Sequence, residues 1–204
     1  MAVGVAVAVV VGGIAVGGPA TTPVGLNAAQ VQAGDAVPFS ATELSSDARG
    51  GAMTGPTGPR DAATRKADTL AMWSTPEIDV WVATASAAGE AHLVPLSLAW
   101  TEERLVVAVQ ERSRTARDLT ASGRARLAVG PTRDVTMVDA VLERVVPTAE
   151  SGTLGEAYAA QADWDPRGSA GYVYLVLRPE RVQAWREADE IAGRTLMRDG
   201  AWLV

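Results

Sequence analysis

The chain has 204 residues, which is room for one ordinary domain with an appendage. Its net charge of −6 and pI of about 4.9 argue against a nucleic-acid binder, which needs a basic face to neutralise phosphates. Because it has no cysteine, disulfides, thiolate metal sites and cysteine nucleophiles are excluded. Its single histidine, His92, argues against a histidine-based zinc site. A small anionic cofactor remains compatible, since a local group of arginines is enough to bind it.

The N-terminal part differs in composition from the rest. Residues 1–34 contain no charged side chain, whereas the sequence after Arg60 is rich in charge. Residues 1–18 are apolar but lack the basic start of a signal peptide and are interrupted by glycines. We therefore favour a disordered or non-native extension and linker over residues 1–60, with Met53 as the natural start, in a cytoplasmic protein with no membrane partner. A targeting or anchoring segment is the alternative.

The folded part opens with a helix and continues as a meander of strands. Apolar residues recur at helical spacing over residues 61–74, which predicts a short helix. Alternating patterns over residues 80–85 and 91–100, joined by a turn at Gly89, predict a hairpin. Residues 104–110 form a third predicted strand, whose apolar middle suits a barrel wall buried on both faces.

A second helix and further strands follow. Ser113 can cap a helix, and Gly123 supplies the left-handed residue that ends it. The pair Asp199-Gly200 predicts a tight hairpin turn near the C-terminus. A third helix is expected at residues 151–162, and strands at residues 124–130, 134–146, 171–178 and 182–186. This order predicts an α+β barrel of six or more mostly antiparallel strands with flanking helices.

The segment Ser113-Arg114-Thr115-Ala116-Arg117 gathers groups that bind anions. It supplies two hydroxyls, two guanidinium groups and the free amides of a helix start. The positive end of the helix dipole favours a phosphate, and arginine can bind two of its oxygens at once. The same residues also suit a capped surface helix with solvated arginines, and spacing alone does not decide between the two.

Two stretches of the chain are separated by one predicted strand: His92-Leu93-Val94-Pro95-Leu96-Ser97 and Ser113-Arg114-Thr115-Ala116-Arg117-Asp118-Leu119. Together they resemble the pyridoxamine 5'-phosphate oxidase-like family. The resemblance continues through residues 124–130 and the pattern Trp185…Arg194…Trp202, so it covers residues 61–204. It implies a split β-barrel that binds FMN or the deazaflavin F420. F420 is a candidate cofactor because the Ala/Val/Arg-rich strands resemble those of actinobacterial members, several branches of which bind F420.

The resemblance also implies particular cofactor contacts. The first motif strand lines the isoalloxazine ring and ribityl chain, and the helix start takes the phosphate. A late tryptophan and arginine reach the cofactor from the partner subunit of a homodimer; the alternative for this pair is a core indole and a surface arginine. The implied cofactor-binding residues are His92, Val94, Ser97, Val109, Ser113, Arg114, Thr115, Arg117, Trp185 and Arg194.

Departures from the family pattern narrow the expected activity. Ser97 stands where the true oxidases carry a lysine, and residues 190–194 replace an Arg-Leu-His-Asp-Arg-like stretch that holds the substrate phosphate. We therefore expect not that oxidase but an FMN- or F420-dependent oxidoreductase that transfers hydride to or from an unknown small organic substrate. Its catalytic residues stay unassigned, because the cofactor carries the hydride. The alternative is a non-catalytic ligand binder that acts as a sensor or sequestering protein.

Overall fold

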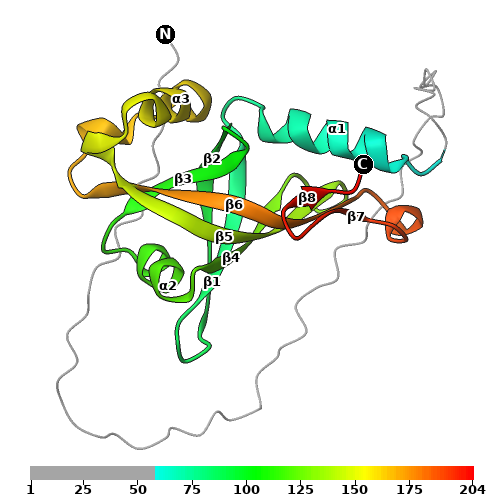
Figure 1. Cartoon of the computed structure of the whole chain (residues 1–204), viewed down its shortest axis with the longest axis horizontal. Helices are drawn as coiled ribbons and strands as arrows, with labels where there is room; N and C mark the ends of the chain where they lie inside the picture. The colour runs from blue at the N-terminus through cyan, green and yellow to red at the C-terminus, as the bar shows by residue number, and fades with distance from the viewer. Residues whose placement is uncertain (1–57) are drawn as a thin grey trace, which may run out of the picture. The chain divides into compact units, whose positions relative to one another are not determined.

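The computed structural model describes residues 58–204, so the prediction for residues 1–57 lies outside the described part. These residues form eight strands, three α-helices and three short 3-10 helices (Figure 1). Within residues 58–204, no helix is long and apolar enough to cross a membrane. The elements are α1 Ala62–Trp73, β1 Asp79–Ala85, β2 Ala91–Thr101, β3 Arg104–Gln110, α2 Arg114–Ser122, β4 Arg124–Val129, β5 Val135–Pro147, η1 Thr148–Glu150, α3 Gly152–Ala162, η2 Pro166–Gly168, β6 Tyr172–Trp185, η3 Ala188–Glu190, β7 Thr195–Arg198 and β8 Ala201–Trp202.

Six antiparallel strands close into a barrel. The sheet runs in the order β3-β2-β1-β4-β5-β6-β7-β8, and an additional pairing of β3 with β6 closes the first six strands on themselves. Strands β7 and β8 extend the sheet beyond β6. This arrangement confirms the predicted α+β split barrel with flanking helices.

The local signals of the sequence act as predicted at α2 and at the last turn. The Ser113 hydroxyl accepts a hydrogen bond from the Ala116 amide at 3.1 Å, and Gly123 ends the helix at a φ of +69°. Between β7 and β8, Asp199 and Gly200 have φ values of +53° and +75°. Two successive left-handed residues match the right-handed twist of the flanking strands, so this short hairpin forms.

Strand β6 differs from the prediction of two separate strands. It runs without a break from Tyr172 to Trp185 and includes Pro179. Arg181 and Pro179 lie opposite two consecutive residues of β5, so Glu180 between them has no partner and forms a β-bulge. Proline lacks the amide hydrogen that a regular strand requires, but a bulge tolerates it, and the strand continues.

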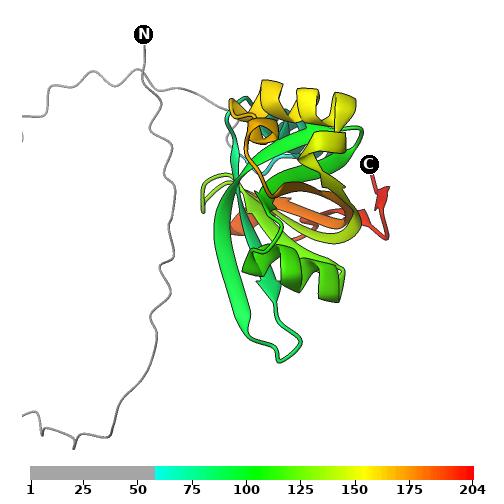
Figure 2. The ribbon, with the colours of Figure 1, turned by 90° about the vertical axis from the view of Figure 1, so that its left-hand side faces the viewer.

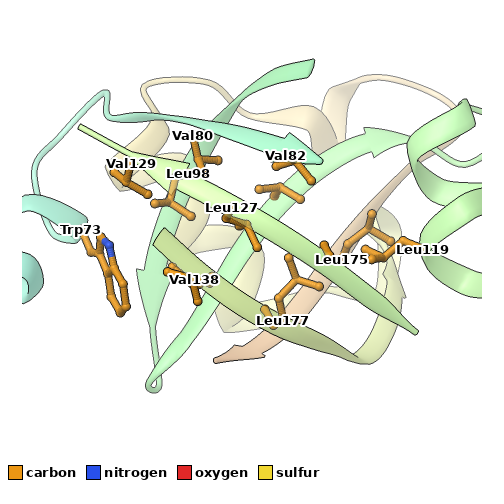
Figure 3. Close-up of a cluster of buried hydrophobic side chains, with 14 of the residues drawn as sticks. Trp73, Val80, Val82, Leu98, Leu119, Leu127, Val129, Val138, Leu175 and Leu177 are labelled. Atoms are coloured by element: carbon orange, nitrogen blue, oxygen red, sulfur yellow. The ribbon is translucent and has the colours of Figure 1, made fainter. Parts of the chain in front are cut away.

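The barrel interior is filled with side chains (Figure 3). Each buried Val or Leu of this kind stabilises the fold by roughly 1.5–3 kcal/mol. Leu119 of α2 packs into this core from one end, and Trp73 of α1, fully buried, lies 4.8 Å from Trp100 between ring centroids. Because side chains fill the interior, we expect a ligand to bind on the outer surface of the barrel. Labelled core residues from the strands are Val80, Val82, Leu98, Leu127, Val129, Val138, Leu175 and Leu177.

The helices cover only part of the barrel. Helix α3 packs on the outer face of β2, β3 and β6 through a second apolar cluster that includes Tyr158 and Tyr174. Helix α2 lies on the opposite side of the barrel from α3, as both views show (Figures 1 and 2). On the outward side of β1 and β2, Trp81 and Leu93 remain 50% and 58% exposed.

Candidate functional site

The predicted helix-start residues surround the first turn of α2. His92 of β2 reaches this turn, and its Nε2 lies 3.2 Å from the Thr115 hydroxyl. Thr115 is buried, whereas Ser113 at the N-cap is half-buried and Arg117 is exposed. The structure therefore brings five predicted residues, Arg114 included, to one end of the barrel.

Two carboxylates already contact the Arg114 side chain. Its Nε lies 3.4 Å from Oδ2 of Asp118, and its Nη2 lies 3.6 Å from Oε2 of Glu90. The same Nη2 donates to the Glu90 carbonyl at 3.1 Å, yet the side chain stays 38% exposed. Asp118 is buried and accepts a hydrogen bond from Thr84 at 3.4 Å, so it is held in place. Glu90 is exposed, and its carboxylate also accepts from the Ser86 hydroxyl at 3.5 Å.

The remaining predicted residues do not all face the same way as His92. His92 and Val94 pair with Thr84 and Val82, whose side chains point inward. Ser97 is an odd number of residues further along β2 and therefore faces outward, where its Oγ donates to Asp79 at 3.3 Å. Val109 is 5% exposed inside the barrel core. The structure does not bring Ser97 or Val109 to the His92–Thr115 pair.

Trp185 and Arg194 form a second cluster. The guanidinium carbon of Arg194 lies 5.8 Å from the ring centroid of Trp185, a cation–π distance. With its amide oxygen turned toward them, Gln183 accepts from Arg194 Nε and Arg181 Nη2, both at 3.1 Å. Gln183, Trp185 and Arg194 border a pocket of about 350 Å³. The pocket is lined by Arg126, Met137, Gln183, Trp185, Ile191 and Arg194.

A second surface pocket, of about 490 Å³, shares Arg126 with the first. Ala83, Arg126 and Asp139 lie side by side on β1, β4 and β5, and Arg126 forms an ion pair with Asp139 at 3.2 Å. Ser122, at the C-terminal end of α2, also lines this pocket, and so does Thr84, whose hydroxyl donates to Asp118. The lining residues are Ala83, Thr84, Ala85, Ser122, Arg124, Ala125, Arg126, Asp139 and Ala140.

Arg126 and Asp139 were not among the predicted site residues. The signal that could have found Arg126 is the alternation of Arg124 and Arg126 with Ala125 and Leu127, which places both arginines on the outer face of β4. Asp139 is placed beside Arg126 only by strand pairing, which the sequence of β5 does not specify.

The fold and these motifs agree with one family of known proteins. The pyridoxamine 5'-phosphate oxidase family model matches residues 76–186, more than half of the 204-residue chain. This chain belongs to the pyridoxamine 5'-phosphate oxidase family. The matched span runs from just before β1 to just after β6, and of the predicted site residues only Arg194 lies beyond it. The predicted family is confirmed.

Solved structures share the fold of this pyridoxamine 5'-phosphate oxidase-family chain at low identity. A heme-binding protein from Mycobacterium smegmatis is 22% identical, with a TM-score of 0.51 over 69% of this chain and 59% of that chain. A conserved hypothetical protein from Mycobacterium tuberculosis is 13% identical, with a TM-score of 0.51 over 61% and 86%. An F420 reductase is 19% identical, with a TM-score of 0.47 over 55% and 93%. No curated protein sequence matches the chain.

Proposed function

We propose that this protein binds FMN or F420 on the outer surface of its barrel and transfers hydride between that cofactor and a small organic substrate. The observation that carries the proposal is the α2 start, where Ser113, Arg114 and Arg117 present hydrogen-bond donors at the positive end of a helix. The family match supports it. The isoalloxazine or deazaflavin ring would supply the hydride chemistry.

The groups at the α2 start fit a phosphate. Guanidinium and backbone N–H groups are donors only, and the Ser113 hydroxyl, which accepts from the Ala116 N–H, still has its own hydrogen to donate. Arg114 is partly exposed and would exchange its contact with the exposed Glu90 carboxylate for phosphate oxygens. Charge-assisted, bidentate contacts of this kind are among the strongest hydrogen bonds in proteins.

Trp185 and Arg194 would contact the ring of a cofactor. An aromatic face and a guanidinium group beside a pocket of about 350 Å³ suit a planar ring that carries polar acceptor atoms. Arg126 lines both this pocket and that of about 490 Å³, whose lining includes Ser122 at the C-terminal end of α2. Arg126, which was not predicted, therefore joins the proposed cofactor contacts.

We also propose that the site is completed by a second copy of the chain. Trp81, Leu93 and Ile191 are exposed large apolar side chains, and Trp81 and Leu93 lie on the same outward face of the hairpin of β1 and β2. Exposed apolar surface of this kind is typical of interaction sites, and most homo-oligomers are two-fold dimers. In such a dimer the Trp185–Arg194 pocket of one protomer would face its partner.

Visible absorption of the purified protein tests this function. Bound FMN gives a two-band flavin spectrum and bound F420 a single intermediate band. Titration with FMN, F420 and riboflavin then measures the preference for a phosphate. If the protein binds none of the three, the proposed function is wrong.

A non-catalytic ligand binder would give a different result. Haem is a relevant probe, because a heme-binding protein has this fold. In this chain, however, His92 is the single histidine, and its Nε2 is already paired with Thr115 at the barrel end. Binding would shift the Soret band of added haem. A shift that the wild type produces and that His92→Ala does not would favour this alternative over the flavin proposal.

A further inference from the structure

The segment from Arg186 to Arg194, which joins β6 to β7, forms one wall of the Trp185–Arg194 pocket. It contributes Ile191 and Arg194 to the lining. The segment has little regular structure of its own, because the three-residue helix η3 is its only element. What holds it in place therefore decides where the two lining side chains lie.

The buried carboxylate of Glu190 anchors this segment to the start of the domain. Its side chain is 2% exposed. It accepts three hydrogen bonds from Arg60, from the backbone amide, Nε and Nη2, at 2.8–2.9 Å. It also accepts from the Arg186 amide at 2.7 Å. Arg60, with an 8% exposed side chain, is further paired with Asp68 and Asp134 at 2.8 and 2.9 Å. Four donors on one buried carboxylate leave it little freedom.

Arg65 of α1 holds the backbone of the same segment. It is 6% exposed, and its Nη1 donates to the carbonyls of Ala184 at 3.4 Å and Glu190 at 3.2 Å. Its Nη2 donates to the Gly193 carbonyl at 3.1 Å. One planar guanidinium thus ties the end of β6 to both ends of the turn that precedes Arg194.

We propose that Arg60 and Arg65 are positioning residues that hold the segment 186–194 so that Ile191 and Arg194 line the pocket beside Trp185. This inference rests on the proposed function, in which that pocket receives the ring of the cofactor. It assigns a role to Arg60, a residue expected to belong to the linker, and it makes the entry to α1 part of the construction of the site.

The alternative is that these arginines contribute only to general stability. A buried ion pair is weak support for stability, because the loss of hydration offsets much of the attraction. Its geometry, however, is specific, since a bidentate contact fixes distance and orientation together. The same segment contains Glu187, which forms a matched exposed pair with Arg133 at 2.7 Å; the Arg133 and Glu187 side chains are 80% and 50% exposed. Loss of that pair should leave the segment in place.

Backbone amide hydrogen exchange of the cofactor-free protein, followed by mass spectrometry, tests the positioning role. We expect Glu190→Ala and Arg65→Ala to speed exchange over residues 186–194 by about tenfold or more, because local opening costs less free energy. Glu187→Ala should leave this exchange unchanged. Equal exchange in wild type, Glu190→Ala and Arg65→Ala would overturn the proposal.

Cofactor titration then connects the segment to the pocket. FMN or F420, whichever the wild type binds, should bind at least about tenfold more weakly to Arg65→Ala and normally to Glu187→Ala. A loosened segment with unchanged affinity would overturn the positioning role. A wild type that binds neither cofactor would overturn the proposed function, while the exchange experiment still decides whether the arginines hold the segment. Should Glu190→Ala not fold, Arg65→Lys, which keeps the charge but loses the planar fork, and the double variant Arg60→Ala/Glu190→Ala provide the same test.

Discussion

At the residue scale, the contacts and exposure of a charged side chain decide which role we propose for it. Arg114 is shared between Glu90 and Asp118, and Glu190 is bound by Arg60. The two sites differ in exposure, since Arg114 is 38% exposed and Glu190 has a 2% exposed side chain. An exposed guanidinium is available to a ligand, whereas a buried, saturated carboxylate is a structural anchor. The predictions for these two residues follow from this difference.

Replacing Arg114 tests the proposed anion site. Arg114→Ala removes a charge-assisted contact worth roughly 1.5–3 kcal/mol, so phosphate-bearing cofactor should bind about tenfold to a hundredfold more weakly. Arg114→Lys should recover part of this loss, because it keeps the charge without the fork. Titration of FMN and riboflavin measures the effect, with Arg133→Ala, an exposed arginine, as control. Equal affinity of the wild type for FMN and riboflavin would mean that α2 is only a capped surface helix.

Glu190 predicts a specific loss of stability in acid. Its hydrogen bonds with the Arg60 guanidinium lower its pKa to about 2 from an ordinary value of 4.5. Because the folded-state pKa is the lower one, the stabilisation is complete above about pH 4.5 and is lost as the pH falls toward 2. The difference in Tm between wild type and Glu190→Gln should therefore be constant from pH 7 to about 5 and shrink below that. A difference that does not change down to pH 2.5 would contradict this assignment.

At the element scale, the termini of helices and strands were set by short-range chemistry, and β6 by its partners. Ser113 and Gly123 delimit α2 as predicted. From the local sequence, Pro179 is expected to end a strand, but it lies within β6. The strand continues because the neighbouring bulge removes the need for an amide hydrogen at this position. Gly123 and Gly130 stand at the two ends of β4, both with positive φ, and only one of them is crowded.

Alanine substitution at these two glycines should have unequal effects. At Gly123, with a φ of +69° and no atom within 4 Å of an added Cβ, the cost is the backbone strain of about 1–2 kcal/mol. At Gly130, with a φ of +91°, an added Cβ would lie 2.7 Å from the Asp134 carbonyl oxygen and from the Met72 sulfur. Gly130→Ala should therefore lower the Tm more than Gly123→Ala. Equal decreases in the Tm of the two variants would show that the backbone at Gly130 relaxes to accommodate the added Cβ.

At the scale of the whole molecule, the two clusters of predicted residues lie at different places on one barrel. The His92–Thr115 pair marks the α2 end, and the Trp185–Arg194 pair borders the pocket formed with β4 and β5. Trp81 and Leu93 are exposed on the hairpin of β1 and β2. A two-fold dimer through this face would let two chains contribute to each cofactor site.

A charge placed in this face should prevent dimerisation. In the dimer, Leu93→Glu would bury an unpaired carboxylate, which costs several kcal/mol. Sedimentation at micromolar concentration should give a dimer for the wild type and a monomer for Leu93→Glu. Val145→Glu, a matched substitution at a 40% exposed valine on β5, should remain dimeric. A monomeric wild type that binds cofactor stoichiometrically would rule out the shared site and with it the partner role of Trp185 and Arg194.

The sequence by itself determined the features that depend on neighbouring residues. Hydrophobic alternation, the Ser113 cap and the Asp199-Gly200 turn predicted nearly every element, since these interactions form within a few residues. The segment proposed to bind an anion was identified for the same reason, because its donors are consecutive in the chain.

Only the tertiary structure decided which distant residues meet. Arg60 and Glu190 are 130 residues apart in the chain, and no local pattern links them. Barrel closure buried Val109, and the strand pleat turned Ser97 away from His92, although all three had been grouped in one site. Strand pairing likewise placed Arg126 beside Asp139. Such contacts depend on strand register and on the closing pair of β3 and β6, which arise from the packing of the whole core rather than from any one segment.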